Sequence, residues 1–210
     1  MSSKPLLSFD EIAEESPFFL APEERPDWPA LFDNDHPLML EIGFGNGKFL
    51  IEMAAREPGC NFIGLDFYHR GIRKIVSRIE KLQMANVRIV YGDAREKVPF
   101  IFNPGELAGV YINFPDPWPK KRHIKRRLIK PAFLKVLAEK LKGGGLLRLA
   151  TDSEPYAREM LDYLEADLAF RNNCGPCAFR EERDDLPMTK YENNFIKAGE
   201  RIYYLDFTRE

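Results

Sequence analysis

One loop of the sequence combines a carboxylate, three prolines and a dense block of positive charge. The loop runs from Asn113 to Arg127 and holds Asp116 among the prolines. Proline fixes φ and lacks a backbone donor, so this loop is stiff and cannot continue a strand or a helix. Seven of the chain's 31 Lys and Arg lie between Lys120 and Lys130, although the formal net charge is -2. The pattern predicts a polyanion lying across a pocket that carries the Asp116 carboxylate.

A set of four acids could hold a cofactor, because each stands near the end of an apolar run. These acids are Glu41, Asp66, Asp93 and Asp116. At the end of a parallel strand, Asp66 can accept both hydroxyls of a ribose. Asp93 is well placed for an adenine amino group, and Glu41 for the ammonium of an amino acid, directly or through water. The set fits S-adenosylmethionine, which has a cation, a diol and an adenine but no phosphate. Each acid alone could instead serve as an N-cap or make a loop hydrogen bond.

Three glycines separate the first predicted strand from the helix that follows it. Gly43, Gly45 and Gly47 have the spacing G-x-G-x-G, whereas a pyrophosphate-binding turn has G-x-G-x-x-G. Glycine permits positive φ and lets a ligand approach the backbone closely. We therefore expect the glycines to border the cofactor, although a tight turn without a ligand has the same pattern.

The elements that must position these residues alternate between strand and helix. Parallel strands are predicted at residues 38–42, 61–66, 87–91, 107–113 and 146–150. Helices are predicted at residues 48–56, around 72–79, at 128–141 before a run of three glycines, and from an N-cap at 151–153 to about residue 168. Two closing strands are predicted near residue 178 and at 201–207. This alternation is typical of a doubly wound, mostly parallel α/β sheet.

Length and charge indicate one domain with an appendage. The 210 residues, 44% of them hydrophobic, can bury a full core. Residues 1–36 hold nine acids against Lys4 and Arg25, a balance of -7, so residues 37–210 sum to +5 to give the total of -2. We interpret residues 1–36 as an irregular acidic arm with room for one short helix. It could screen the basic face, but we favour a solvated arm. Residues 37–210 form the predicted α/β domain.

The remaining sequence features exclude several classes of protein. No apolar run approaches the roughly 20 residues that cross a bilayer, and no signal segment opens the chain, so a cytoplasmic location is expected. Three cysteines give no disulfide framework. Cys174 and Cys177 have the spacing of a redox motif, but they lack its strand-then-helix setting. With Cys60 distant in sequence they make no zinc site, so we predict a turn there and no metal.

Four segments together carry a family resemblance. They are Glu41–Gly47, Asn113–Arg127, Thr151–Asp152 and Thr189–Glu192. In these segments the chain resembles the tRNA (guanine-N7-)-methyltransferases, over about residues 38–207, and the Pro-Asp-Pro-Trp-Pro-Lys-Lys-Arg-His core is the most specific part. The resemblance implies a class I methyltransferase fold with seven strands, the last antiparallel. It implies S-adenosylmethionine as cofactor and, as substrate, a guanine in the tRNA variable loop (position 46). Oligomeric state is left open.

The resemblance also implies roles for individual residues. Cofactor contacts are expected from Glu41, Gly43, Gly45, Gly47, Asp66, Asp93 and Asp116. Asp116 is the expected catalytic residue. Substrate contacts are expected from Lys120, Asp152, Thr189, Lys190, Tyr191 and Glu192. RNA contacts are expected from Arg122, His123, Ile124, Lys125, Arg126 and Arg127. The family often has Glu at the ribose position and a basic N-terminal arm; here Asp66 is one methylene shorter and the arm is acidic.

Guanine N7 carries an in-plane lone pair and no proton, so its methylation needs no general base. Catalysis can then come from alignment and electrostatics. We expect Asp116 to accept hydrogen bonds from guanine N1–H and the amino group and to offset the developing positive charge. Asn113 could help through its amide. Competing functions are a methyltransferase for another nucleic-acid nitrogen or a protein side chain, and an RNA-binding module without activity.

Structural alternatives stand beside the proposed roles. Asp116 could make an Asx-type hydrogen bond within its proline turn. Trp118 could pack at the rim of the loop rather than stack on a base. Thr189–Glu192 has a helix-capping pattern, and Asp152 could cap the next helix.

Overall fold

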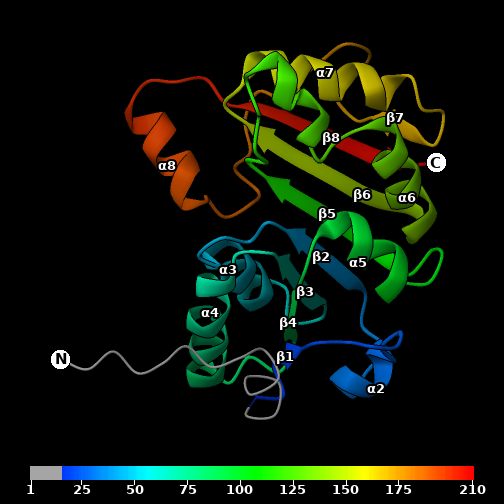
Figure 1. The fold of residues 1–210 in the computed structure, drawn as a ribbon, viewed down its shortest axis with the longest axis vertical. Coiled ribbons are helices and arrows are strands. Elements are labelled where there is room, and N and C mark those ends of the chain that lie inside the picture. The colour runs from blue at the N-terminus through cyan, green and yellow to red at the C-terminus, as the bar shows by residue number, and fades with distance from the viewer. Residues whose placement is uncertain (1–15) are drawn as a thin grey trace.

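A computed structural model describes residues 16–210, and its centre is one eight-stranded sheet (Figure 1). The strands are β1 Phe19–Leu20, β2 Leu38–Ile42, β3 Asn61–Asp66, β4 Val87–Tyr91, β5 Leu107–Asn113, β6 Leu141–Thr151, β7 Phe170–Asn172 and β8 Tyr203–Arg209. Their order in the sheet is β1-β4-β3-β2-β5-β6-β8-β7. Strand β8 runs antiparallel to both of its neighbours, and the other pairings are parallel. The predicted fold class is confirmed, with one strand more than the seven expected, because β1 pairs with β4.

Helices cover both faces of the sheet. They are α2 Trp28–Phe32, α3 Lys48–Arg56, α4 His69–Leu82, α5 Ala94–Ile101, α6 Pro131–Lys140, α7 Glu154–Glu165 and α8 Lys190–Lys197, with a 3₁₀ helix, η1, at Lys121–Arg126. Alternate side chains of β2 enter different cores: Leu40 packs with apolar residues of α2, α5, α6 and α7, whereas Met39 packs with those of α3 and α4. This alternation follows from the two-residue period of a strand. Within residues 16–210 no helix is long and apolar enough to span a membrane.

Four predicted boundaries differ from the structure. The predicted helix at 128–141 begins only at Pro131, because the residue before a proline avoids helical geometry. It ends at Lys140, and β6 runs through the three glycines that were expected to lie between helix and strand. Helix α7 ends at Glu165 rather than near Leu168, whose side chain is 93% exposed and has no apolar packing to hold another turn.

The closing strands also differ from the prediction. The strand expected near residue 178 is instead β7 at Phe170–Asn172, and the later segment contributes a single bridge between Arg180 and Tyr204. Phe170 enters the main core and pairs with Arg209, which explains why the strand forms there. The predicted strand at 201–207 is observed as β8, shifted by two residues toward the carboxyl end.

Residues 16–36 of the acidic segment pack against the sheet and its helices. Trp28 is fully buried, and its indole Nε1 donates a hydrogen bond to the Ile101 carbonyl at 3.0 Å. Its ring stacks on Phe102 with 5.5 Å between centroids. The one short helix expected in this segment is α2. Residues 1–15 of the predicted arm lie outside the described residues.

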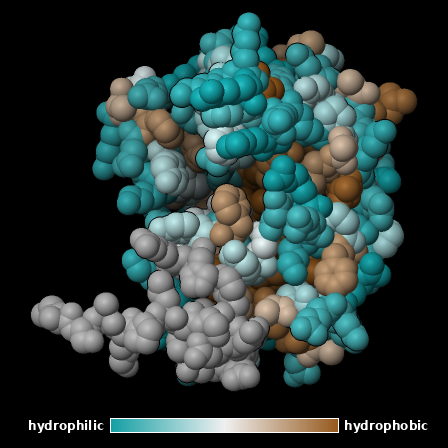
Figure 2. All heavy atoms as spheres, viewed as in Figure 1, coloured by the Kyte–Doolittle hydropathy of each residue, from teal (hydrophilic) through white to brown (hydrophobic). Residues whose placement is uncertain are grey.

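Figure 2 shows hydrophilic side chains over most of the viewed face.

Candidate active site

The carboxyl ends of the parallel strands meet at one edge of the sheet and border a cavity of about 1410 Å³. A pocket for one small ligand is typically about 300–1,000 Å³, so this cavity has room for a cofactor and a base together. Most of the predicted site residues line it: Glu41, Gly43, Gly45, Asp66, Asp93, Asp116, Arg126, Asp152, Thr189, Lys190 and Tyr191. The other predicted site residues are not among its lining residues: Gly47, Lys120, Arg122, His123, Ile124, Lys125, Arg127 and Glu192.

The three glycines between β2 and α3 have two different functions. All three have positive φ, at 76°, 55° and 70° for Gly43, Gly45 and Gly47. A Cβ atom on Gly47 would lie 1.9 Å from the side chain of Ile75, so this glycine permits close packing of α3 and α4. A Cβ on Gly43 or Gly45 would meet no atom of the described residues within 4 Å. These two glycines therefore leave open space along the cavity, as the predicted cofactor role requires.

Asp66 is tied to the glycine turn through the backbone. Its Oδ2 accepts a hydrogen bond from the Gly45 amide at 2.8 Å, and its Oδ1 accepts one from Tyr68 at 2.9 Å. The loop hydrogen bond considered for this acid is thus present. An ionised carboxylate has about four acceptor positions, so two remain available to the hydroxyls of a ribose.

Asp93 is the N-cap of α5. Its Oδ1 accepts from the Arg95 amide at 2.9 Å, and its Oδ2 pairs with the Arg95 guanidinium at 2.5 Å. The side-chain hydrogen bond from Arg95 lowers the pKa of Asp93. The carboxylate lines the cavity while it caps the helix, so both predicted roles are sterically compatible.

Glu41 is the most strongly perturbed acid of the site. It is 2% exposed, and burial raises the pKa of its carboxyl to about 8. The neighbouring Asp66 adds to the rise, whereas Asn113 and Arg183 oppose it. Oε1 accepts a long hydrogen bond of 3.4 Å from the Asn113 amide, and Oε2 has no hydrogen-bond partner within the described part of the chain. A buried carboxyl oxygen without a partner calls for a donor, and a ligand ammonium in the cavity fits that need.

Asp116 projects from the proline loop into the same cavity. It is exposed, and no hydrogen bond or ion pair joins its side chain to another described residue. The Asx-type hydrogen bond considered from the sequence is therefore not made. Phe114 and Trp118, on either side of it, have positive φ of 53° and 41°, so the loop turns sharply at both points. Such backbone geometry is costly and persists where the surroundings enforce it.

Arg127 supplies one of those enforcing contacts. Its Nε donates to the Pro117 carbonyl at 2.7 Å, its Nη1 forms an ion pair with Glu159 of α7, and its guanidinium lies 4.7 Å above the ring of Tyr156. The residue is only 6% exposed. The RNA contact expected of Arg127 stays a prediction, and burial with three partners makes this residue an anchor that ties the loop carrying Asp116 to α7.

The other cations of the basic run stand on η1 at the surface. Lys121, Arg122, Lys125 and Arg126 are exposed. His123 meets the edge of Trp118 at 5.7 Å between centroids, and the Arg126 guanidinium lies 5.1 Å from the centroid of the same ring. Trp118 therefore packs within the loop, which agrees with the rim-packing alternative. Ile124 is half-buried in η1.

The segment Thr189–Glu192 opens α8 with a capping box. The Thr189 hydroxyl accepts from the Glu192 amide, and the Glu192 carboxylate accepts from the Thr189 amide, each at 3.0 Å. Glu192 is 2% exposed and also accepts from Arg183 and Tyr204. The substrate contact expected of Glu192 stays a prediction, and the hydrogen bonds described for its carboxylate are all made inside the protein. Its neighbour Tyr191 is 62% exposed and lines the cavity.

Ser153 rather than Asp152 occupies the N-cap position of α7, and its side chain makes no capping hydrogen bond. This leaves Asp152 at the wall of the cavity without a capping role. Cys177 donates its amide and its thiol to Glu165, and the side-chain hydrogen bond to that carboxylate raises the pKa of the thiol. In the described range, no cluster of His, Cys, Asp and Glu could hold a metal ion.

Sequence reasoning missed Phe67, Tyr68 and Arg183. Both aromatic side chains are exposed and line the cavity next to Asp66, so an aromatic pair after an acidic strand end was an available signal. Arg183 is buried between the cavity and α8. It lies in a stretch of alternating charges at residues 180–185, where nothing in the sequence distinguishes it.

The strand order, with β8 antiparallel beside β6, is that of the class I methyltransferase fold. Solved structures with this fold include the 16S rRNA methyltransferase KamB, with a TM-score of 0.62 and 17% identity over 90% of this chain and 95% of that one. The antibiotic-resistance methyltransferase Kmr has a TM-score of 0.59 and 16% identity, over 87% and 91% of the two chains. A family model described as "Putative methyltransferase" matches residues 35–205.

Sequence relatives identify the family within this class. The tRNA (guanine-N(7)-)-methyltransferase of Geobacter metallireducens is 40% identical over 92% of this chain and 93% of the relative. The one from Halorhodospira halophila is 44% identical over 85% and 78%. The chain belongs to the tRNA (guanine-N(7)-)-methyltransferase family, as the sequence motifs predicted.

Proposed function

We propose that this protein transfers a methyl group from S-adenosylmethionine to N7 of a guanine in the variable loop of tRNA, position 46. The family supports tRNA guanine as the substrate. The observation that supports the mechanism most is the position of Asp116, whose side chain has no partner in the described part of the chain and which opens into the cavity bordered by Glu41, Asp66 and Asp93. A tRNA-modifying role agrees with the expected cytoplasmic location.

The residues at the strand ends fit the donor. Glu41 offers a buried, unpartnered oxygen to the ammonium, and Asp66 offers acceptors to the ribose. Gly43 and Gly45 leave room along the backbone, and Asp93 stands where an adenine amino group can donate. When bound, the sulfonium of S-adenosylmethionine supplies an electrophilic methyl carbon.

Asp116 acts by hydrogen bonding to the base, because N7 carries no proton that a general base could remove. Its two oxygens accept from guanine N1–H and the amino group, which fixes the ring and offsets the positive charge that develops on it. Tyr191 and Lys190, at the first turn of α8, face the base and the adjoining backbone from the other side of the cavity. Asp152 completes this wall.

The exposed cations of η1 position the RNA through its phosphates. Replacing Lys121, Arg122 and Lys125 together by alanine is expected to raise the tRNA dissociation constant about tenfold. Each lost phosphate contact should also reduce the slope of log K against log salt by about one. Filter binding or fluorescence anisotropy at several salt concentrations measures both quantities.

Lys142→Ala is the matched control, because this exposed lysine lies at the amino end of β6, the opposite edge of the sheet from the cavity. It should leave affinity and salt slope unchanged. If the triple variant also binds with wild-type affinity and slope, the phosphate role of η1 fails.

Ligand binding at the end of the cavity bordered by Glu41 and Asp66, here called the donor end, is expected to release a proton. With a pKa of about 8, Glu41 is protonated at pH 6.5 in the free protein, but it must ionise to pair with an ammonium. The groups that face it are Asp66, Asn113 and Arg183. Calorimetry of S-adenosylhomocysteine binding at pH 6.5 in two buffers should show release of about one proton, and affinity should rise from pH 6 toward 8.

Glu41→Gln should bind more weakly and release almost no proton. The folded state binds this proton more tightly than the unfolded chain, so Glu41 stabilises the free protein fully at low pH. That stabilisation is lost as pH rises from about 4.5 through about 8. Glu41→Gln should therefore unfold at a temperature that changes less with pH over this window. Equal proton release by both proteins would contradict the ammonium contact.

Labelled methyl transfer separates this function from its competitors. Incubation with total tRNA, ribosomal RNA and cellular protein should place label in tRNA alone. Label in protein or ribosomal RNA would support a methyltransferase for a protein side chain or for another nucleic-acid nitrogen. Tight tRNA binding without any transfer would support the RNA-binding module.

A further inference from the structure

A chain of hydrogen bonds connects the donor end of the cavity to the start of α8. Asn113, the last residue of β5, donates its amide Nδ2 to Glu41 Oε1 at 3.4 Å. The Asn113 carbonyl oxygen accepts from Arg183 Nη1 at 2.7 Å. Arg183 Nη2 donates to Glu192 Oε2 at 2.5 Å. Four side chains from separate parts of the sequence thus form one continuous link.

Arg183 determines which way the Asn113 amide faces. A guanidinium can only donate hydrogen bonds, so the atom that meets it must be the amide oxygen. The amide NH₂ group is then directed at Glu41 and the cavity. The rings of Phe49 and Tyr204, 5.6 and 5.1 Å from the guanidinium carbon, hold Arg183 in this place.

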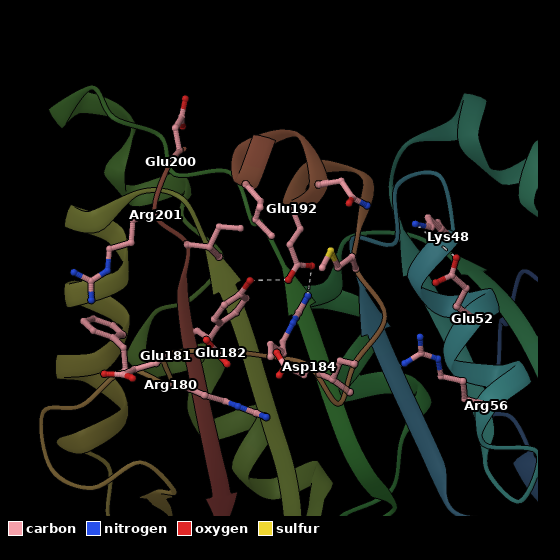
Figure 3. Close-up of a pocket in the computed structure, with 18 residues that line it drawn as sticks. Lys48, Glu52, Arg56, Arg180, Glu181, Glu182, Asp184, Glu192, Glu200 and Arg201 are labelled. Carbon is pink, nitrogen blue, oxygen red and sulfur yellow. Dashed lines mark hydrogen bonds and ion pairs between the residues drawn. The ribbon is translucent and has the colours of Figure 1, made fainter. Parts of the chain in front are cut away.

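The other end of the link holds the first turn of α8. Figure 3 shows Glu192 with its carboxylate between a tyrosine hydroxyl and a guanidinium, at the wall of a second cavity behind the helix. The Tyr204 hydroxyl donates to Glu192 Oε1 at 2.7 Å. Because Glu192 also closes the capping box with Thr189, its position sets where Lys190 and Tyr191 enter the active-site cavity.

We propose that Arg183 is a positioning residue that couples occupancy of the donor end of the cavity to the placement of α8 against the substrate. This inference rests on the proposed function, since it assumes an ammonium at Glu41. A carboxylate accepts a hydrogen bond more strongly than a neutral carboxyl group, so ionised Glu41 draws the Asn113 amide closer than the long 3.4 Å contact. This movement of Asn113 is transmitted to Glu192 through the planar guanidinium of Arg183, which donates a hydrogen bond to each of the two side chains.

Hydrogen exchange tests the coupling without use of catalytic activity. Saturating S-adenosylhomocysteine, which keeps the amino acid, ribose and adenine, should slow amide exchange in Lys190–Lys197 of the wild type about fivefold or more. In Arg183→Lys the charge is kept, but one ammonium cannot reproduce the planar fork that bridges two acceptors. This variant should still bind the ligand by calorimetry, while its α8 exchange should respond less than twofold.

Arg180→Lys is the matched control, because Arg180 is a nearby arginine that pairs with Asp185 and Asp206 and does not contact Asn113 or Glu192. It should respond as the wild type does. If Arg183→Lys does not fold, the same exchange experiment uses the double variant Arg183→Met, Glu192→Met, which removes both buried charges together. The double variant should bind the ligand without slowing of α8 exchange.

The outcomes separate the two proposals. Failure of the wild type to bind S-adenosylhomocysteine would count against the proposed function. Binding with no change in α8 exchange, or an unchanged response in Arg183→Lys, would overturn the coupling alone and leave the methyltransferase proposal intact.

Discussion

Replacing Asp116 by alanine should lower kcat for methyl transfer to tRNA by at least about 100-fold, a typical loss for a group that stabilises transition-state charge. The tRNA dissociation constant should stay within about threefold, because the η1 cations supply most of the affinity. Thermal stability should not fall, since the Asp116 side chain is exposed and has no partner among the described residues. Single-turnover kinetics with saturating tRNA measures the chemical step directly.

Two further variants sharpen this test. Asp162→Ala removes an exposed aspartate of α7 that does not line the cavity, and it should behave as wild type. Asp116→Asn keeps the size of the side chain but loses one acceptor and the charge, so it should be nearly as slow as alanine. Wild-type turnover in either Asp116 variant would remove this residue from the mechanism.

Replacing Arg127 by alanine should destabilise the protein by about 2–3 kcal/mol, because it removes a buried guanidinium that bonds Pro117 and Glu159, although Lys130 still pairs with Glu159. At about 2–4 °C per kcal/mol for a chain of this size, the melting temperature should fall by about 4–12 °C. Turnover should fall as well, because the Pro117 carbonyl loses its donor and the loop carrying Asp116 loses its anchor. Calorimetric unfolding and steady-state kinetics measure the two effects.

The neighbouring Arg126 provides the contrast within the same sequence motif. Arg126→Ala should weaken tRNA binding. Its melting temperature should stay within about 3 °C of wild type, because this side chain is exposed on the Trp118 ring. If Arg127→Ala leaves stability intact and only weakens tRNA binding, the anchor role is refuted and the predicted RNA contact of Arg127 is supported.

The sheet was predictable because its strands are apolar runs with polar residues at their ends. The predicted bounds of β2, β3, β4 and β5 agree with the structure, and so do those of α3. The predicted bounds are wrong where the local sequence pattern predicts one element and strand pairing in the folded chain imposes another. The three glycines before Leu146 resemble a helix stop followed by a loop, but pairing with β5 and β8 extends β6 on both sides of the predicted strand.

The site was predictable in its acids and less so in its arginines. Glu41, Asp66, Asp93 and Asp116 converge because parallel strands end at one edge, a consequence of topology alone. Arg126 and Arg127 have the same charge and adjacent positions, but one is exposed and the other buried. Residue type does not encode burial, and the partner that buries Arg127 lies 32 residues away in Glu159.

The proposed mechanism places a methyl donor at the strand ends, facing a guanine that Asp116 aligns. Mass spectrometry of tRNA nucleosides and mapped fragments, after incubation with purified protein and S-adenosylmethionine, tests it most directly. We expect 7-methylguanosine at position 46 with the wild type and almost none with Asp116→Ala. Methylation of another nucleoside, or equal yields from both proteins, would contradict it.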